Sequence, residues 1–79
     1  MQDEQDEIDK RYMRLALRLA LKGAGRTSPN PMVGAVLVKG GRIIATGFTQ
    51  PAGSDHAEIV ALKRAGKRAR DAALYLNLE

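Results

Sequence analysis

The segment that most restricts the fold of this chain is residues 33–38, Val-Gly-Ala-Val-Leu-Val, which contain no polar side chain. A strand that alternates apolar and polar residues can leave one face in water, whereas a continuous apolar run needs cover on both faces. The run is followed by Gly40 and Gly41, and then by a second strand-like segment at residues 43–48. This arrangement is typical of a hairpin with a short turn. We therefore predict a central strand with a hairpin partner and with further elements packed on both faces.

Two segments with helical periodicity flank the hairpin and can supply this cover. Residues 8–22 place apolar side chains at helical spacing, and Gly23 follows them as a stop signal. Residues 55–70 form a second helical segment with an alanine-rich apolar face. A third strand is predicted at residues 73–78, and we expect it to return by a right-handed crossover and lie parallel to a neighbour. The expected class is α/β, of order α-β-β-α-β with a mixed sheet.

Charge is divided sharply along the chain. Residues 1–7 carry four acids and little that could be buried, so they are predicted to be a disordered acidic tail before one domain at residues 8–79. Residues 11–79 carry twelve bases and four acids, a net charge of +8 that suits a phosphate-bearing partner. With only three aromatic residues available for stacking on bases, a nucleic acid is an unlikely partner.

Composition excludes several other classes. A chain of 79 residues is one domain at most, and such chains bury only about 60% of their unfolded surface. No apolar run is long enough to cross a membrane, and the acidic start does not resemble a secretory or transit peptide. We therefore expect a cytoplasmic protein without membrane contact. Because there is no cysteine, the 79 residues contain neither disulfides nor thiolate metal ligands.

The best candidate for chemistry is the triplet His56-Ala57-Glu58 at the start of the second helical segment. An imidazole can bind a metal, and Glu58 projects onto the side of the helix that faces the sheet, where a carboxylate suits a proton shuttle. Two simpler explanations remain open: Asp55 and Glu58 have the spacing of a capping box, and a single histidine at a helix start is often a surface residue. Zinc deaminases combine His-x-Glu with a later Pro-Cys-x-x-Cys, of which only the first half occurs here.

A second candidate is the segment Thr-Ser-Pro-Asn-Pro at residues 27–31. Its two prolines fix their own φ and push the preceding residues towards extended geometry, which restrains Asn30 from both sides. The chain from Tyr12 to Glu79 resembles the N-terminal deaminase domain of the bifunctional riboflavin biosynthesis deaminase/reductase, in the cytidine deaminase-like superfamily. The resemblance is carried by residues 25–35 (Gly-Arg-Thr-Ser-Pro-Asn-Pro-Met-Val-Gly-Ala), 56–62 (His-Ala-Glu-Ile-Val-Ala-Leu) and 74–79 (Leu-Tyr-Leu-Asn-Leu-Glu).

The resemblance implies a three-layer fold, of which this chain is an incomplete portion, and a role for four residues. His56 would bind zinc, Glu58 would move protons between the attacking water and the pyrimidine amine, and Asn30 and the backbone of Ala57 would contact the substrate. Two cysteine ligands are expected beyond Glu79, so the 79 residues are expected to be inactive alone. The substrate would be a phosphoribosylated diaminopyrimidine, NADPH would serve only an absent reductase domain, and the full-length parent could be a homo-oligomer.

Two other functions are each favoured by one feature of the chain. The basic body favours a tRNA adenosine or other nucleobase deaminase, whereas the proline-asparagine segment does not. The lack of cysteine fits a non-catalytic interaction module with a deaminase-like fold. One departure from the riboflavin family also stands out, because many of its members carry a histidine where this chain has Thr49.

Overall fold

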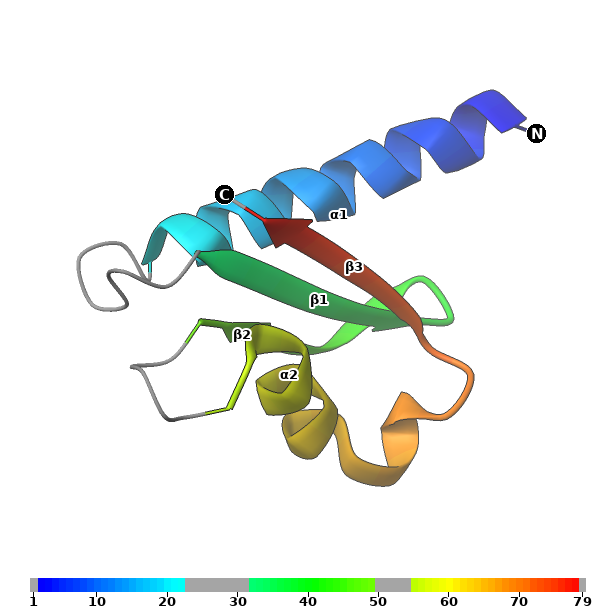
Figure 1. Cartoon of the computed structure of the whole chain (residues 1–79). Coiled ribbons are helices and arrows are strands. Elements are labelled where there is room, and N and C mark those ends of the chain that lie inside the picture. The colour runs from blue at the N-terminus through cyan, green and yellow to red at the C-terminus, as the bar shows by residue number, and fades with distance from the viewer. Residues whose placement is uncertain (1, 23–31, 50–54, 79) are drawn as a thin grey trace.

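The structure is a computed structural model that describes residues 2–22, 32–49 and 55–78. Its elements, in chain order, are α1 (Gln2–Lys22), β1 (Val33–Lys39), β2 (Arg42–Phe48), α2 (Ala57–Ala65), the 3₁₀ turn η1 (Gly66–Ala69) and β3 (Ala73–Leu78). Three strands form the middle layer, α1 lies across one face of the sheet, and α2 lies on the other (Figure 1). The three-layer α/β architecture predicted from the sequence is confirmed for the part of the chain described.

The sheet has the order β2-β1-β3, so β1 is central, as its apolar sequence predicts. Both neighbours run antiparallel to β1, and the prediction of a mixed sheet is therefore wrong. The crossover through α2 does return the chain in the direction of β2, but β3 pairs with the free edge of β1 instead of with β2. Pairing on both edges gives hydrogen-bond partners to the backbone N–H and C=O groups of this buried strand.

The hairpin between β1 and β2 has the expected two-residue turn. Lys39 pairs with Arg42, and Gly40 and Gly41 between them have φ of 59° and 75°. Positive φ at both positions is characteristic of the turns that match the twist of a hairpin. Leu37 pairs with residue 45 and the next residue of β1 with residue 43, which leaves one extra residue on β2 as a bulge.

The side chains of β1 alternate between two buried clusters. On the α1 face the buried cluster comprises Ala16, Leu19, Val36 and Val38. On the α2 face it comprises Ala35, Leu37, Ala45, Ala57, Ala61 and Ala65. Because one strand contributes to both clusters, the single apolar run found in the sequence ties the three layers together.

The first helix begins earlier than the sequence predicts. We expected a disordered tail over residues 1–7, yet α1 starts at Gln2. Asp9 accepts hydrogen bonds from Gln5 Nε2 at 2.8 Å and from the Tyr75 hydroxyl of β3. Acidic residues in the first turns of a helix also interact favourably with its dipole. The sequence prediction counted only the spacing of apolar residues, so it could detect neither the hydrogen bonds of Asp9 nor the interaction with the helix dipole.

The second helix is shorter than predicted. The expected span of residues 55–70 divides into α2 and η1, because Gly66 adopts a φ of 58° and its N–H bonds to the carbonyl of Leu62. A glycine with positive φ at this position is a common way to end an α-helix. The alanine-rich face of α2 is buried, whereas Leu62 near the end of the helix is 39% exposed.

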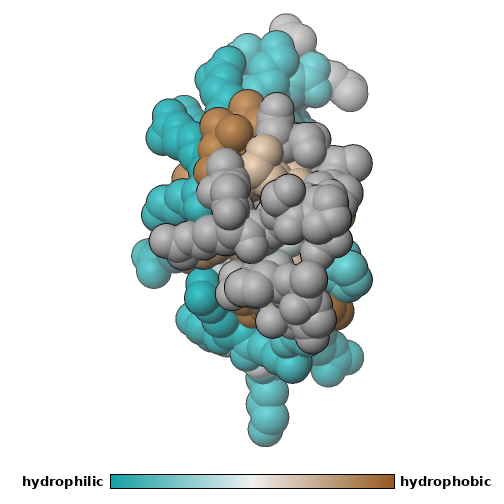
Figure 2. Space-filling view, turned by 60° about the vertical axis from the view of Figure 1, so that its left-hand side comes forward, coloured by the Kyte–Doolittle hydropathy of each residue, from teal (hydrophilic) through white to brown (hydrophobic). Residues whose placement is uncertain are grey.

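Hydrophilic side chains cover much of the described surface in the view of Figure 2, with smaller apolar areas between them. Among the described residues, the large apolar side chains with substantial exposure are Ile8, Leu21, Ile43, Ile59, Leu62, Leu74 and Leu76. Leu74 and Leu76 pair with residues of β1 that face α2, and their exposure of 43% and 42% shows that α2 does not cover them. No helix in the described parts of the chain is long and apolar enough to cross a membrane.

Candidate functional site

The start of α2 is positioned by a glycine in the strand beneath it. Gly47 of β2 lies directly against the backbone of Ala57 and Ala61, and any side chain at this position would overlap the carbonyl oxygen of Ala57. A glycine inside a strand often marks such a close approach of another backbone. Ala57 itself is only 1% exposed. The middle residue of the His56-Ala57-Glu58 triplet is thus fixed against the sheet.

His56 is the N-cap residue of α2. Its backbone is extended, with φ of −67° and ψ of 159°, and its carbonyl accepts a hydrogen bond from the N–H of Val60 at 3.0 Å. The residue is exposed, and its imidazole makes no capping hydrogen bond to the helix. The backbone of His56 therefore begins the helix while its side chain takes no part in the cap.

Glu58 lies in the first turn of α2 and is partly buried. On the opposite flank of the helix, Arg64 donates a hydrogen bond to the carbonyl of Thr46 on β2 at 3.1 Å. At 100° per residue, Glu58 and Arg64 lie on either side of the line of alanines that packs on the sheet. Glu58 consequently occupies the flank directed towards β3.

The capping-box alternative does not describe this arrangement. A capping box would need Asp55 as the N-cap and Glu58 three residues later, whereas the N-cap is His56. Asp55 instead forms an ion pair with Lys63, at 2.7 Å between Oδ2 and Nζ. The carboxylate of Glu58 is therefore not explained by capping of its own helix.

Thr49 has a structural role that the sequence did not suggest. Its hydroxyl accepts a hydrogen bond from the N–H of Val33 at 2.6 Å and donates one to the Val33 carbonyl at 3.1 Å. The N–H of Thr49 also bonds to that carbonyl, at 2.9 Å. These bonds join the end of β2 to the start of β1. The only signal in the sequence is a hydroxyl residue immediately after a strand.

Several chain segments meet at this end of the sheet. Val33, at the start of β1, pairs with Leu78 at the end of β3, and its neighbour in β1 pairs with Phe48 at the end of β2. The first turn of α2 lies over the same end of β2. In α/β folds, ligand sites commonly form where strands end and crossover helices begin. Asn30, the fourth residue singled out from the sequence, lies outside the described residues.

The described residues supply only part of a metal site. They contain no group of three or more histidine, cysteine, aspartate or glutamate side chains that could hold a metal ion. Catalytic zinc sites use three protein ligands and keep one open position. His56, exposed and unused in capping, is chemically suited to be one ligand, and the sequence contains no second histidine and no cysteine.

The fold places an exposed histidine and a partly buried glutamate together at the start of its crossover helix. The family model of the cytidine and deoxycytidylate deaminase zinc-binding region matches residues 6–79. The chain belongs to this family.

The relatives narrow the class further. The chain is 56% identical to the riboflavin biosynthesis protein RibD of Aquifex aeolicus over 73 residues, which are 92% of this chain and 20% of that protein. It is 49% identical to RibD of Escherichia coli, covering 90% of this chain and 19% of the relative. It thus spans about a fifth of the length of the curated relatives that it matches.

Solved structures give the same result. RibD of Acinetobacter baumannii has a TM-score of 0.87 at 42% identity, covering 90% of this chain and 20% of that chain. A diaminohydroxyphosphoribosylaminopyrimidine deaminase/5-amino-6-(5-phosphoribosylamino)uracil reductase of Thermotoga maritima has a TM-score of 0.84 at 46% identity, covering 90% and 21% respectively. These relatives favour the riboflavin branch over a tRNA-type deaminase or a non-catalytic module.

Proposed function

We propose that this chain is the first part of a hydrolytic deaminase domain that acts on a phosphoribosylated diaminopyrimidine in riboflavin biosynthesis. The observation that carries the proposal is the placement of His56 and Glu58 on either side of the buried Ala57, where α2 begins over the end of β2. The family match through residues 6–79 and the name of the Thermotoga maritima relative support the reaction and the substrate class.

His56 would hold zinc as one of three protein ligands, and two cysteines from outside these 79 residues would complete the set. When bound, zinc lowers the pKa of water and supplies a nucleophile near neutral pH. The exposure of the imidazole and its lack of a capping bond leave it available for this role. Without the remaining ligands, we expect the 79 residues neither to retain zinc tightly nor to deaminate.

Glu58 would act as the proton shuttle. It would take a proton from the attacking water and deliver it to the exocyclic amine, so that the carbon–nitrogen bond breaks and ammonia leaves. Its partly buried position in the first turn of α2, beside His56, supports this role. The backbone of Ala57 and the side chain of Asn30 would hold the pyrimidine ring, and the basic body of the chain would favour the phosphate of the substrate.

The test uses the chain extended by the rest of the deaminase domain of the Aquifex aeolicus relative. Ammonia release and bound zinc are measured for the parent and for Glu58→Gln, which removes the proton shuttle but no zinc ligand. We expect kcat to fall by about 10²-fold to 10⁴-fold while zinc content is unchanged. His56→Ala should lose both zinc and activity.

Asp55→Asn is the matched control, because Asp55 lies three residues from Glu58 but is paired with Lys63 at the surface. It should keep both zinc and turnover. Undiminished turnover in Glu58→Gln would remove the role assigned to this residue. In a longer parent protein, NADPH chemistry would belong to a reductase domain elsewhere in the sequence, and a cytoplasmic location and assembly into homo-oligomers remain predictions.

A further inference from the structure

Helix α1 covers its face of the sheet unevenly. It packs mainly against β1 and β3 and makes little contact with β2. Ile43 of β2 pairs with Val38, which belongs to the buried cluster beneath α1, so the Ile43 side chain is on the same face of the sheet as the helix. Ile43 is nevertheless 45% exposed. A strip of β2 beside α1 is therefore left uncovered.

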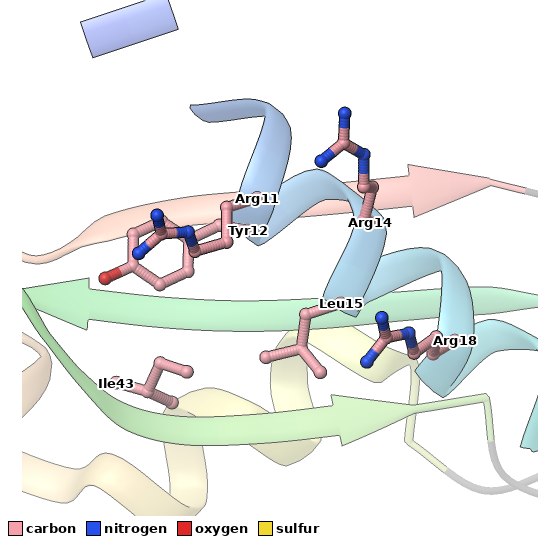
Figure 3. A pocket seen from close by; sticks show the side chains of 6 residues that line it. All are labelled: Arg11, Tyr12, Arg14, Leu15, Arg18 and Ile43. Carbon is pink, nitrogen blue, oxygen red and sulfur yellow. The ribbon is translucent and has the colours of Figure 1, made fainter. Parts of the chain in front are cut away.

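An open cavity of about 260 Å³ lies between this strip and the helix. The residues that line it are Arg11, Tyr12, Arg14, Leu15, Arg18 and Ile43. In Figure 3 the side chains of Leu15 and Ile43 point toward one another across the space, with Arg11 and Arg18 at its two ends. The guanidinium group of Arg14 points away from it. The cavity therefore has an apolar floor between two cationic ends.

The two arginines at the ends are available to a ligand. Both are exposed, and among the described residues neither guanidinium group takes part in a hydrogen bond or an ion pair. On a helix, a charged side chain can pair with neighbours three or four positions away. Arg18 has no acidic neighbour at these positions. Arg11 has Glu7, but this carboxylate is paired with Lys10 at 3.7 Å.

The spacing of the two arginines sets the length of a complementary ligand. Arg18 follows Arg11 by seven residues, which is two turns of helix and about 10 Å along the helix axis. Leu15 lies between them on the same side of α1. A guanidinium group binds a carboxylate or a phosphate through paired N–H donors, and the apolar floor favours a hydrocarbon body. The matching ligand therefore carries an acidic group at each end of an apolar body.

We propose that this cavity binds small molecules of that kind, such as long-chain dicarboxylates. One acidic group would pair with Arg11 and the other with Arg18, while the apolar body would lie over Leu15 and Ile43. The cavity is on the α1 face of the sheet, and His56 is at the start of α2 on the opposite face (Figure 1). A ligand in the cavity would therefore leave the proposed deaminase site free, and the inference is independent of the zinc chemistry.

Other occupants satisfy fewer of these groups. Inorganic phosphate would pair with one guanidinium group and leave the apolar floor exposed. A helix of a partner protein is about 10–12 Å across with its side chains, which is too wide for a cavity of this volume. Single-stranded nucleic acid needs aromatic rings for its bases to stack on. The ring that lines the cavity, Tyr12, is partly buried, and its hydroxyl donates to the carbonyl of Gly41 at 3.4 Å.

The test is an NMR titration of the 79-residue chain with succinate, adipate, suberate and sebacate, at about 50 mM salt so that screening is limited. We expect saturable shifts of the Leu15 and Ile43 methyl signals. The affinity should increase along the series as the separation of the two carboxylates approaches about 10 Å. Suberate should bind about threefold more tightly than octanoate, which has the same number of carbons but one carboxylate. Simple adsorption to an apolar surface predicts the opposite order.

Four variants locate the ligand. Arg11→Gln and Arg18→Gln each remove one cationic end, so each should bind suberate about threefold more weakly than the parent and no more tightly than octanoate. Ile43→Thr reduces the apolar floor at an exposed strand position and should weaken the binding of both compounds. Arg14→Gln is the matched control, because it removes the same charge from the same helix but from a side chain that points away. It should change the Kd for suberate by less than about twofold. Circular dichroism establishes that each variant is folded.

Three results would overturn the proposal. They are octanoate that binds as tightly as suberate, Arg14→Gln that weakens binding as much as Arg18→Gln, and a titration without saturable shifts at Leu15 and Ile43. Inorganic phosphate, added as a competitor, gives a fourth readout. Phosphate that binds as tightly as suberate would assign the arginines to a simple anion and would also overturn the proposal.

Discussion

At the scale of single residues, Thr49 shows how a departure from a family pattern can carry a structural role. The sequence marks this residue as a hydroxyl residue that follows a strand, at a position where many members of the family that it resembles have histidine. In the structure its hydroxyl both accepts from and donates to the backbone of Val33. These bonds fix the point at which the chain enters β1, next to the start of α2.

Thr49→Val keeps the shape of the side chain but removes both hydroxyl hydrogen bonds. We expect the free energy of unfolding to fall by about 1–3 kcal/mol, because the N–H of Val33 loses its partner in a half-buried place. Thr49→Ser retains the hydroxyl and should recover most of this loss. Urea denaturation of the three proteins measures the effect, and equal stability of the valine and serine variants would contradict the assigned role.

At the scale of elements, α1, which extends to Gln2, is joined to β3 by contacts of Tyr75. The Tyr75 hydroxyl donates to Asp9, and the Tyr75 ring packs against Tyr12 with 5.1 Å between centroids. The hydrogen bond from Tyr75 lowers the pKa of Asp9, with a smaller contribution from Gln5. The same bond, followed by partial burial, raises the pKa of Tyr75 to about 12.

The pH dependence of the hydrogen bond between Tyr75 and Asp9 follows from the directions of the two pKa shifts. The stabilisation from Asp9 is present above the ordinary carboxyl pKa and is lost as pH falls through its lowered value. The stabilisation from Tyr75 is present below its ordinary pKa of 10.0 and is lost as pH rises through about 12. Amide hydrogen exchange of α1 should therefore show the first turns most protected between these limits.

Tyr75→Phe removes the hydroxyl and leaves the ring contact with Tyr12. We expect faster exchange over the first two turns of α1 at neutral pH, with the later turns unchanged because they remain packed on β1. In this variant the protection should no longer change as Asp9 titrates. Protection of the first turns identical to that of the parent would show that they do not depend on β3.

At the scale of the whole molecule, two glycines allow the three layers to approach closely. Gly34 of β1 lies against the backbone of Ala16 and Ala20 in α1, and Gly47 of β2 lies against the backbone of Ala57 and Ala61 in α2. A side chain at either strand position would overlap a helix backbone, which cannot move aside by changing rotamer. The separation of the layers is set at these two points.

Gly47→Ala should therefore displace α2 from the sheet and destabilise the chain by about 1–3 kcal/mol, as overpacked cores do. In the extended protein it should also weaken zinc binding, because His56 begins the displaced helix. Thr46→Ala is the neighbouring control on the opposite face of β2, and its effect should be smaller. Thermal unfolding and zinc content measure the two effects, and a Gly47→Ala variant with parental values for both would refute the packing argument.

Much of the fold could be predicted from periodicity, because helices and strands bury side chains at different spacings. The bounds of β1, β2 and β3 differ from the predicted ones by at most one residue at either end. The ends of the helices were predicted less well, since they depend on Gly66 and on the contact of Asp9 with Tyr75. The triplet at residues 56–58 is recognised from its residue types, but only the structure shows that the His56 side chain makes no capping hydrogen bond.

The sequence by itself determined the order of the elements, the central place of β1 and the residues available for chemistry, because these depend on which side chains must avoid water. The tertiary structure decided which edge of β1 receives β3, how far α1 extends and what surrounds Glu58. Those outcomes depend on contacts between residues far apart in the chain, and no local pattern records them.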